Sequence, residues 1–157
     1  MLKSLWKLEK ITVKSCDSLE QVFDHLEGLN YEENRVRLLP NLEEMNLTEL
    51  PKLRCIWNKD PTRILRFYSL RWLNIHKCNN LRNLFSPSML PNMSWEFRGL
   101  KITNCPNMVE IVEKEKGANQ AAIDKIVFCC SRYTILEGLP NHSRFYPRNH
   151  TLESFDG

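Results

Sequence analysis

One apolar template, used four times, constrains the fold of this chain more than any other feature. Apolar residues fall at offsets 0, 3, 5, 8, 11 and 14 from the starting residues Leu8, Leu42, Leu70 and Phe97. All twenty-four positions are apolar, whereas a 42% apolar composition would place about ten there by chance. A repeat of this length indicates a stack of similar units. In the third copy the template residues are Leu70, Leu73, Ile75, Cys78, Leu81 and Leu84.

The spacing inside each copy is that of a leucine-rich repeat. The copies start 34, 28 and 27 residues apart. Alternation at offsets 3 and 5 predicts a short strand with those side chains inward and offsets 2, 4 and 6 outward. Each repeat then forms one turn of the chain, called a coil below. A single coil cannot bury its apolar edge, so neighbouring coils must stack. The predicted strands are Lys10–Lys14, Glu44–Thr48, Trp72–His76 and Gly99–Thr103.

These patterns predict an α/β leucine-rich-repeat solenoid, with a curved parallel sheet on its concave face and mainly loops or short helical turns on its convex side. We expect one domain over residues 1–157, with repeats near 8–41, 42–69, 70–96 and 97–127 and a degenerate fifth over 128–157. In the fifth repeat the template register selects Thr134 and Leu136, whereas Ile135 suggests a slipped strand. The polar segment 113–125 is either a solvated loop on the convex side or a short amphipathic helix.

Composition and motifs exclude several classes of function. A net charge of +3 is too small to indicate a nucleic-acid partner. The longest apolar runs are only a few residues, which predicts no membrane span and no signal peptide, and therefore a cytoplasmic protein that could also enter the nucleus. No phosphate-binding loop, zinc-protease helix or nucleophile elbow occurs. We expect neither enzymatic activity nor a cofactor.

The cysteines are predicted to be structural. Cys16, Cys78 and Cys105 occupy offset 8 in three repeats, where the second repeat has Leu50. A small buried thiol explains this pattern, because free cysteine is among the most buried residue types. The chain has no closely spaced cysteine pair of the C-x₂-C kind, so no zinc site is expected.

The function must then be sought on the outward strand positions. Side by side, these residues would line the concave sheet, which is the surface that solenoids offer to extended partners. Trp72 is the best anchor, since Trp is enriched among binding hot spots, although it could also simply pack over its neighbours. The predicted protein-binding residues are Lys10, Lys14, Glu44, Asn46, Arg71, Trp72, Asn74, His76 and Lys101.

Three segments resemble a known family. The strings LEEMNLTELPKLRCIW at 42–57, LRWLNIHKCNNLRNLFSPSM at 70–89 and LKITNCPNMVEIVEK at 100–114 resemble the C-terminal repeats of plant nucleotide-binding leucine-rich-repeat disease-resistance receptors, especially the coiled-coil class. The resemblance implies a fragment of an intracellular immune receptor. Its partner would be a pathogen effector, a guarded host protein or the receptor's own nucleotide-binding module.

Two other interpretations stay open. The repeats could be the substrate arm of a ubiquitin ligase, although no adaptor-binding motif is visible. The chain could also be a non-functional truncated remnant, because it lacks the coiled coil and the phosphate-binding loop of the receptor family. An inhibitor of the ribonuclease-inhibitor type is disfavoured by the 34-residue first period.

Overall fold

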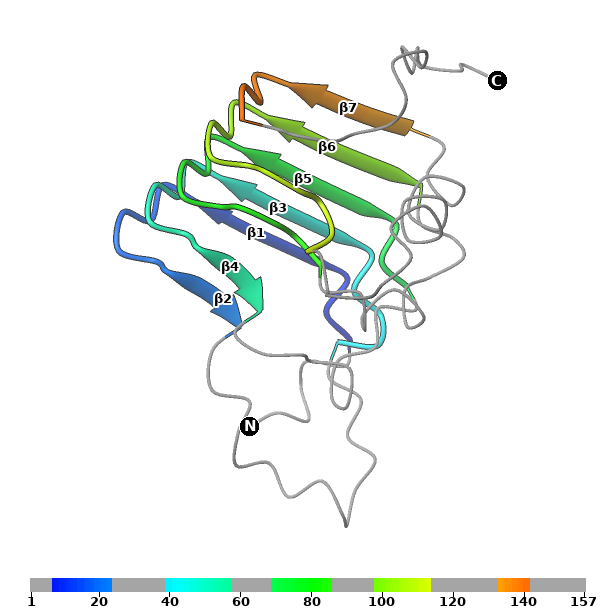
Figure 1. Cartoon of the computed structure of the whole chain (residues 1–157). Helices are drawn as coiled ribbons and strands as arrows, with labels where there is room; N and C mark the ends of the chain where they lie inside the picture. The colour runs from blue at the N-terminus through cyan, green and yellow to red at the C-terminus, as the bar shows by residue number, and fades with distance from the viewer. Residues whose placement is uncertain (1–6, 24–38, 58–68, 86–97, 114–132, 142–157) are drawn as a thin grey trace.

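Parallel strands dominate the structure. The computed structural model describes residues 7–23, 39–57, 69–85, 98–113 and 133–141 (Figure 1). Five strands form one parallel sheet in the order β1-β3-β5-β6-β7, and two shorter strands, β2 and β4, form a second parallel pair. The large sheet consists of β1 (Lys10–Lys14), β3 (Glu44–Thr48), β5 (Trp72–His76), β6 (Gly99–Thr103) and β7 (Tyr133–Glu137).

The first four strands of the large sheet coincide with the four predicted ones. Their register follows the template, because Val13, Leu47 and Ile75, all at offset 5, lie opposite one another. Leu47 and Ile75 are almost completely buried. The template therefore predicted both the strand positions and the inward face, since only this register places every leucine-class side chain in one core.

A tight turn of the same kind follows each strand of the large sheet. The residue after the strand adopts a left-handed backbone, with φ between 52° and 63°. In each of the first four repeats the N–H at offset 11 then donates a hydrogen bond to the C=O at offset 8, as from Leu81 to Cys78 at 3.3 Å. These turns carry the chain from the large sheet to the second layer, which contains β2 and β4. The left-handed residues are Ser15, Glu49, Lys77, Asn104 and Gly138.

The described part of the second layer is built of strands and turns. β2 (Gln21–Phe23) pairs with β4 (Cys55–Trp57), and an isolated bridge joins Phe85 to Val112. Among the described residues there is no α-helix, so the short helical turns considered as an alternative for this side are not found there. The chain stays extended here because its backbone groups bond to the next coil, as Arg54 N–H does to the Glu20 carbonyl at 2.9 Å.

The apolar core lies between the two layers and extends across the middle coils. Aromatic residues close it beside β2 and β4, where the Phe23 and Trp57 rings stack with centroids 5.3 Å apart. The Trp57 indole N–H donates a 2.8 Å hydrogen bond to the Leu84 carbonyl, which ties the second coil to the third.

Burial falls off in the first coil. Met45 and Leu47 are completely buried, whereas Ile11 and Val13, which occupy the same template positions, are only half-buried. Among the cysteines, Cys78 and Cys105 are buried as predicted, but Cys16 is exposed. The prediction for Cys16 was wrong because an inward position is fully covered only when repeats pack on both of its sides, and in the described residues β1 has a neighbouring strand on one side only.

The last described strand, β7, shows which residues of the fifth repeat point into the core. β7 pairs with β6 so that Thr134 faces Leu100 and Leu136 faces Ile102, while Ile135 lies beside Lys101. The slipped strand that Ile135 suggested is therefore wrong, and the template register holds with Thr134 buried in place of an aliphatic residue. The segment predicted as a loop or helix at 113–125 lies outside the described residues after position 113.

Candidate protein-interaction surface

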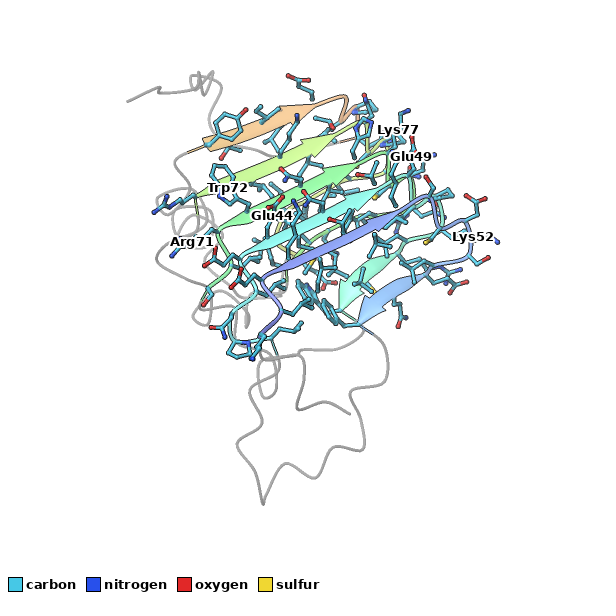
Figure 2. The ribbon with its side chains drawn as sticks, turned by 180° about the vertical axis from the view of Figure 1, so that it is seen from behind. Glu44, Glu49, Lys52, Arg71, Trp72 and Lys77 are labelled. Atoms are coloured by element: carbon cyan, nitrogen blue, oxygen red, sulfur yellow. The ribbon has the colours of Figure 1, made fainter. Side chains whose placement is uncertain are left out.

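The outward side chains of the large sheet form three rows across its strands. The face that carries them is called the outer face below, and it is the face turned toward the viewer in Figure 2. Because neighbouring strands lie about 4.8 Å apart, side chains of one row lie within reach of one another. The first row is Lys10, Glu44, Trp72, Gly99 and Tyr133, the second is Thr12, Asn46, Asn74, Lys101 and Ile135, and the third is Lys14, Thr48, His76, Thr103 and Glu137.

A polar ladder joins β1, β3 and β5. Lys10 Nζ lies 3.0 Å from Glu44 Oε1, and that same carboxylate oxygen accepts a 2.7 Å hydrogen bond from Asn46 Nδ2. Asn74 Nδ2 in turn donates to Asn46 Oδ1 at 2.6 Å. The hydrogen bond from Asn46, followed by the bond and charge of Lys10, lowers the pKa of Glu44 below its ordinary value. Four of the predicted binding residues, Lys10, Glu44, Asn46 and Asn74, are thus linked to one another by an ion pair and hydrogen bonds.

Trp72 dominates the other half of the outer face. It is 38% exposed and is the exposed large hydrophobic residue of the described part of the chain. Its ring reaches over Gly99, where an added Cβ would collide with the indole atoms Cζ3 and Cε3. Beyond Gly99 it meets Tyr133 edge-on, with centroids 6.2 Å apart and planes at 64°. One aromatic side chain therefore spans three strands.

The remaining predicted residues lie on or beside this face. His76 Nδ1 is 2.7 Å from the Thr103 hydroxyl, and Lys14 and Lys101 are exposed at opposite parts of the sheet. Arg71 directly precedes β5 and lies at one end of the sheet, next to Trp72 (Figure 2). Its backbone N–H bonds to the Glu43 carbonyl at 2.8 Å. Eight predicted residues therefore share the outer face, and Arg71 lies at its margin.

Three residues of this face, Tyr133, Ile135 and Glu137 of β7, were not among the predicted binding residues. Tyr133 and Ile135 both point outward from β7, beside Gly99 and Lys101. The signal that could have placed them is the step of 34 residues from β6, which assigns them to offsets 2 and 4 of the template. That step selected Thr134 and Leu136 as inward residues, but the apolar Ile135 beside the polar Thr134 suggested a slipped strand, so the outward residues of β7 were not assigned.

A second surface lies at the carboxyl ends of the strands, where the left-handed residues line up. A shallow, open groove of about 690 Å³ runs there, lined by Lys77, Pro51 and Pro106 among others. Ser15 Oγ donates a 2.8 Å hydrogen bond to Glu49 Oε2, and Lys77 Nζ lies 3.8 Å from the other carboxylate oxygen. The Ser15 bond, and then nearby cations, lower the pKa of Glu49. Figure 2 shows Glu49 and Lys77 together, at the opposite end of the sheet from Arg71.

The five described ranges of the chain also bear on metal binding, membrane insertion and thiol chemistry. No group of three or more His, Cys, Asp or Glu side chains within those five ranges could hold a metal ion. No helix in the same ranges is long and apolar enough to cross a membrane. The buried Cys78 thiol is held protonated, because its Cys105 neighbour and its burial raise its pKa far above the ordinary value.

The repeated strand, left-handed turn and extended return define a leucine-rich-repeat type of protein with one parallel sheet. Residues 1–106 match the family described as plant disease resistance protein RPS2-like, leucine-rich repeats. This match covers more than half of the chain, which therefore belongs to that family of plant resistance leucine-rich repeats. No curated protein and no solved structure matches it. Leucine-rich-repeat domains generally mediate protein–protein interaction through the exposed face of their sheet.

Proposed function

We propose that the chain is the protein-interaction module of an intracellular plant immune receptor of the coiled-coil nucleotide-binding class. In this proposal its coils continue as a curved solenoid, it works in the cytoplasm or nucleus, and it has no catalytic activity of its own. The family match supports the link to plant resistance. The other support is the outer face, where outward side chains from five strands stand in register around the exposed Trp72.

The partner in this proposal is a protein. It is a pathogen effector, a guarded host protein or the nucleotide-binding module of the receptor itself, and in the last case the contact is autoinhibitory. A face with an exposed tryptophan and charges of both signs suits protein recognition, since Trp and Arg are enriched among binding hot spots. The acidic Glu44 and Glu137 interrupt its basic residues, which disfavours a continuous nucleic-acid track.

The test is co-precipitation of the full 157-residue chain from plant tissue with the coiled-coil and nucleotide-binding segment of a receptor of this family, and separately with candidate effectors. We expect the double variant Trp72→Ala, Lys101→Glu to lose the partner that the wild type retains. Lys52→Glu is the control, because it makes the same charge change at an exposed position that lies away from Trp72 (Figure 2). If the folded double variant kept every partner of the wild type, the outer-face proposal would be wrong.

A further inference from the structure

In the half of the outer face formed by β5, β6 and β7, neighbouring residues hold the Trp72 ring in place. The indole ring of Trp72 occupies the space that any side chain at position 99 would need, and it ends against Tyr133. Glycine at position 99 is therefore what allows the ring to lie across β6. A ring placed in this way loses little freedom when a partner binds, so more of its contact energy appears as affinity.

Apolar and cationic groups surround the Trp72 and Tyr133 rings. Ile135, half-buried, and Lys101, exposed, form the next row beside Trp72 and Tyr133, and the exposed Arg98 directly precedes β6. Within the described ranges no carboxylate forms an ion pair with Arg98 or Lys101. Of the described carboxylates near this face, Glu43 precedes β3 and Glu44 is already held by Lys10. Glu137 is exposed in the third row, at the other end of β7 from Tyr133.

The two halves of the face therefore differ in what they can offer. In the β1–β3 half, Lys10, Glu44 and Asn46 bond to one another, and the ladder ends on Asn74 of β5. A partner there would have to replace bonds that already exist. In the β5–β7 half, aromatic surface lies beside Arg98 and Lys101, with which no described carboxylate forms an ion pair, so a partner can add contacts to these two cations and to the exposed Trp72 ring.

We propose that the surface formed by Trp72, Gly99, Tyr133, Ile135, Arg98 and Lys101, the aromatic platform, binds an extended acidic segment of a partner protein that carries an aromatic side chain. This inference rests on the proposed function and specifies its partner. The aromatic side chain packs against Trp72 and Tyr133. Flanking carboxylates meet Arg98 and Lys101, whose charges also repel a cationic ligand at the indole.

The experiment is a selection of peptides from a randomised phage-displayed library on the full wild-type chain, with counter-selection on Trp72→Ala. We expect the enriched peptides to carry one aromatic residue flanked by Asp or Glu. A synthetic peptide of that composition should bind about tenfold more weakly to Trp72→Ala and to Lys101→Glu, as measured by calorimetry. Replacing its aromatic residue by alanine should weaken binding to a similar extent.

Two further variants test whether the position of the Trp72 ring matters, and not only its presence. Gly99→Ala keeps every aromatic residue but displaces the Trp72 ring, so it should also weaken peptide binding by several-fold. Lys52→Glu should leave the affinity within about twofold, because Lys52 is exposed and lies away from Trp72 (Figure 2). Circular dichroism and thermal melting confirm that each variant is folded before its affinity is compared.

The outcomes distinguish this inference from the proposed function. Enrichment of basic or purely aliphatic peptides, no enrichment at all, or peptides that bind Trp72→Ala and Gly99→Ala as well as wild type would overturn the platform. Tighter binding of a single-stranded oligouridylate than of any selected peptide would overturn it in favour of nucleic acid. In each case the outer-face proposal still depends on its own co-precipitation result.

Discussion

At the scale of the single residue, Ile75 shows what the inward strand positions contribute. It is 1% exposed and lies in register with Leu47 and Ile102 inside the core. Ile75→Asp would leave an uncompensated charge in that core, so we expect a loss of about 3–5 kcal/mol in the free energy of unfolding. That is much of the roughly 5–15 kcal/mol that holds a typical domain folded.

Thermal and urea unfolding followed by circular dichroism measure this effect. Lys101→Ala is the control, since substitutions at exposed positions usually stay within about 0.5 kcal/mol. Equal destabilisation by the two changes would mean that the inward and outward faces have been assigned wrongly.

Glu44 gives the outer face a pH dependence. The bonds from Asn46 and Lys10 lower the pKa of its carboxyl in the folded chain, so its contribution to stability exists above the unfolded pKa. That contribution disappears as the pH falls through the depressed folded pKa. Glu44→Gln should therefore be less stable than wild type at neutral pH, by at most about 1 kcal/mol for a pair so near the surface.

Urea titrations at a series of pH values check this expectation. The difference between Glu44→Gln and wild type should begin to close once the pH falls below the ordinary glutamate pKa of about 4.3. It should vanish below the depressed folded pKa, where the wild-type carboxyl is protonated as well. Added salt should reduce it at neutral pH. A difference that widens with acid would contradict the pKa direction.

At the scale of the element, the left-handed turn after each strand is the feature that recurs most regularly. Lys77 occupies this turn with φ 52°. Replacing it by glycine removes steric strain but increases the freedom of the unfolded chain, so the net effect should lie between zero and about 1 kcal/mol of stabilisation. Lys77→Val should destabilise by about 1–2 kcal/mol, since a β-branched residue fits this conformation poorly.

The matched control is Lys101→Val, which makes the same exchange in the middle of a strand, where valine is favoured. Chemical unfolding of the three variants gives the comparison. If Lys77→Val and Lys101→Val had equal stability, backbone conformation would not govern the turn.

The Trp57 hydrogen bond is the second element-scale test. Trp57→Phe removes the donor to the Leu84 carbonyl and leaves that buried acceptor without this partner, which should cost about 1–3 kcal/mol. The same exchange at the exposed Trp72 should change the melting temperature little. Differential scanning calorimetry distinguishes the two, and an equal effect at both positions would show that ring volume rather than the hydrogen bond matters.

Elements differ in how far the sequence predicts them. β1, β3, β5 and β6 were predictable because alternation over five residues fixes which side chains enter the core. β2 and β4 were not predicted, because Gln21–Phe23 and Cys55–Trp57 are too short to show a period. Their extended form depends on bonds to the neighbouring coil, which a single sequence does not reveal.

The same distinction holds for the candidate surface. The template placed eight predicted residues on one face, because outward positions follow once inward ones are known. It could not show that Trp72 reaches over Gly99 to Tyr133, since that depends on side-chain direction across three strands. Nor could it show that Cys16 is exposed, because exposure depends on what packs against the first coil.

At the scale of the whole molecule, stability should be graded along the stack of coils. Template residues of β3 and β5 are almost completely buried, whereas those of β1 and Leu136 of β7 are only half-buried. In the described ranges β1 and β7 each pair with one strand, while β3, β5 and β6 pair with two. Because each described strand contacts only its neighbours in the sheet, the outer repeats can open without the middle ones.

Hydrogen exchange measured residue by residue tests this gradient directly. Amides of β5 should exchange at least about tenfold more slowly than the hydrogen-bonded amides of β1 and β7, a ratio that needs only about 1.4 kcal/mol between local and global opening. Ile75→Val, a mild change in the middle of the core, should speed exchange in β5 and its neighbours β3 and β6 together, because these strands share one core. Uniform protection across all five strands would instead show that the stack unfolds as a single unit, with the half-buried first coil as firmly held as the middle of the sheet.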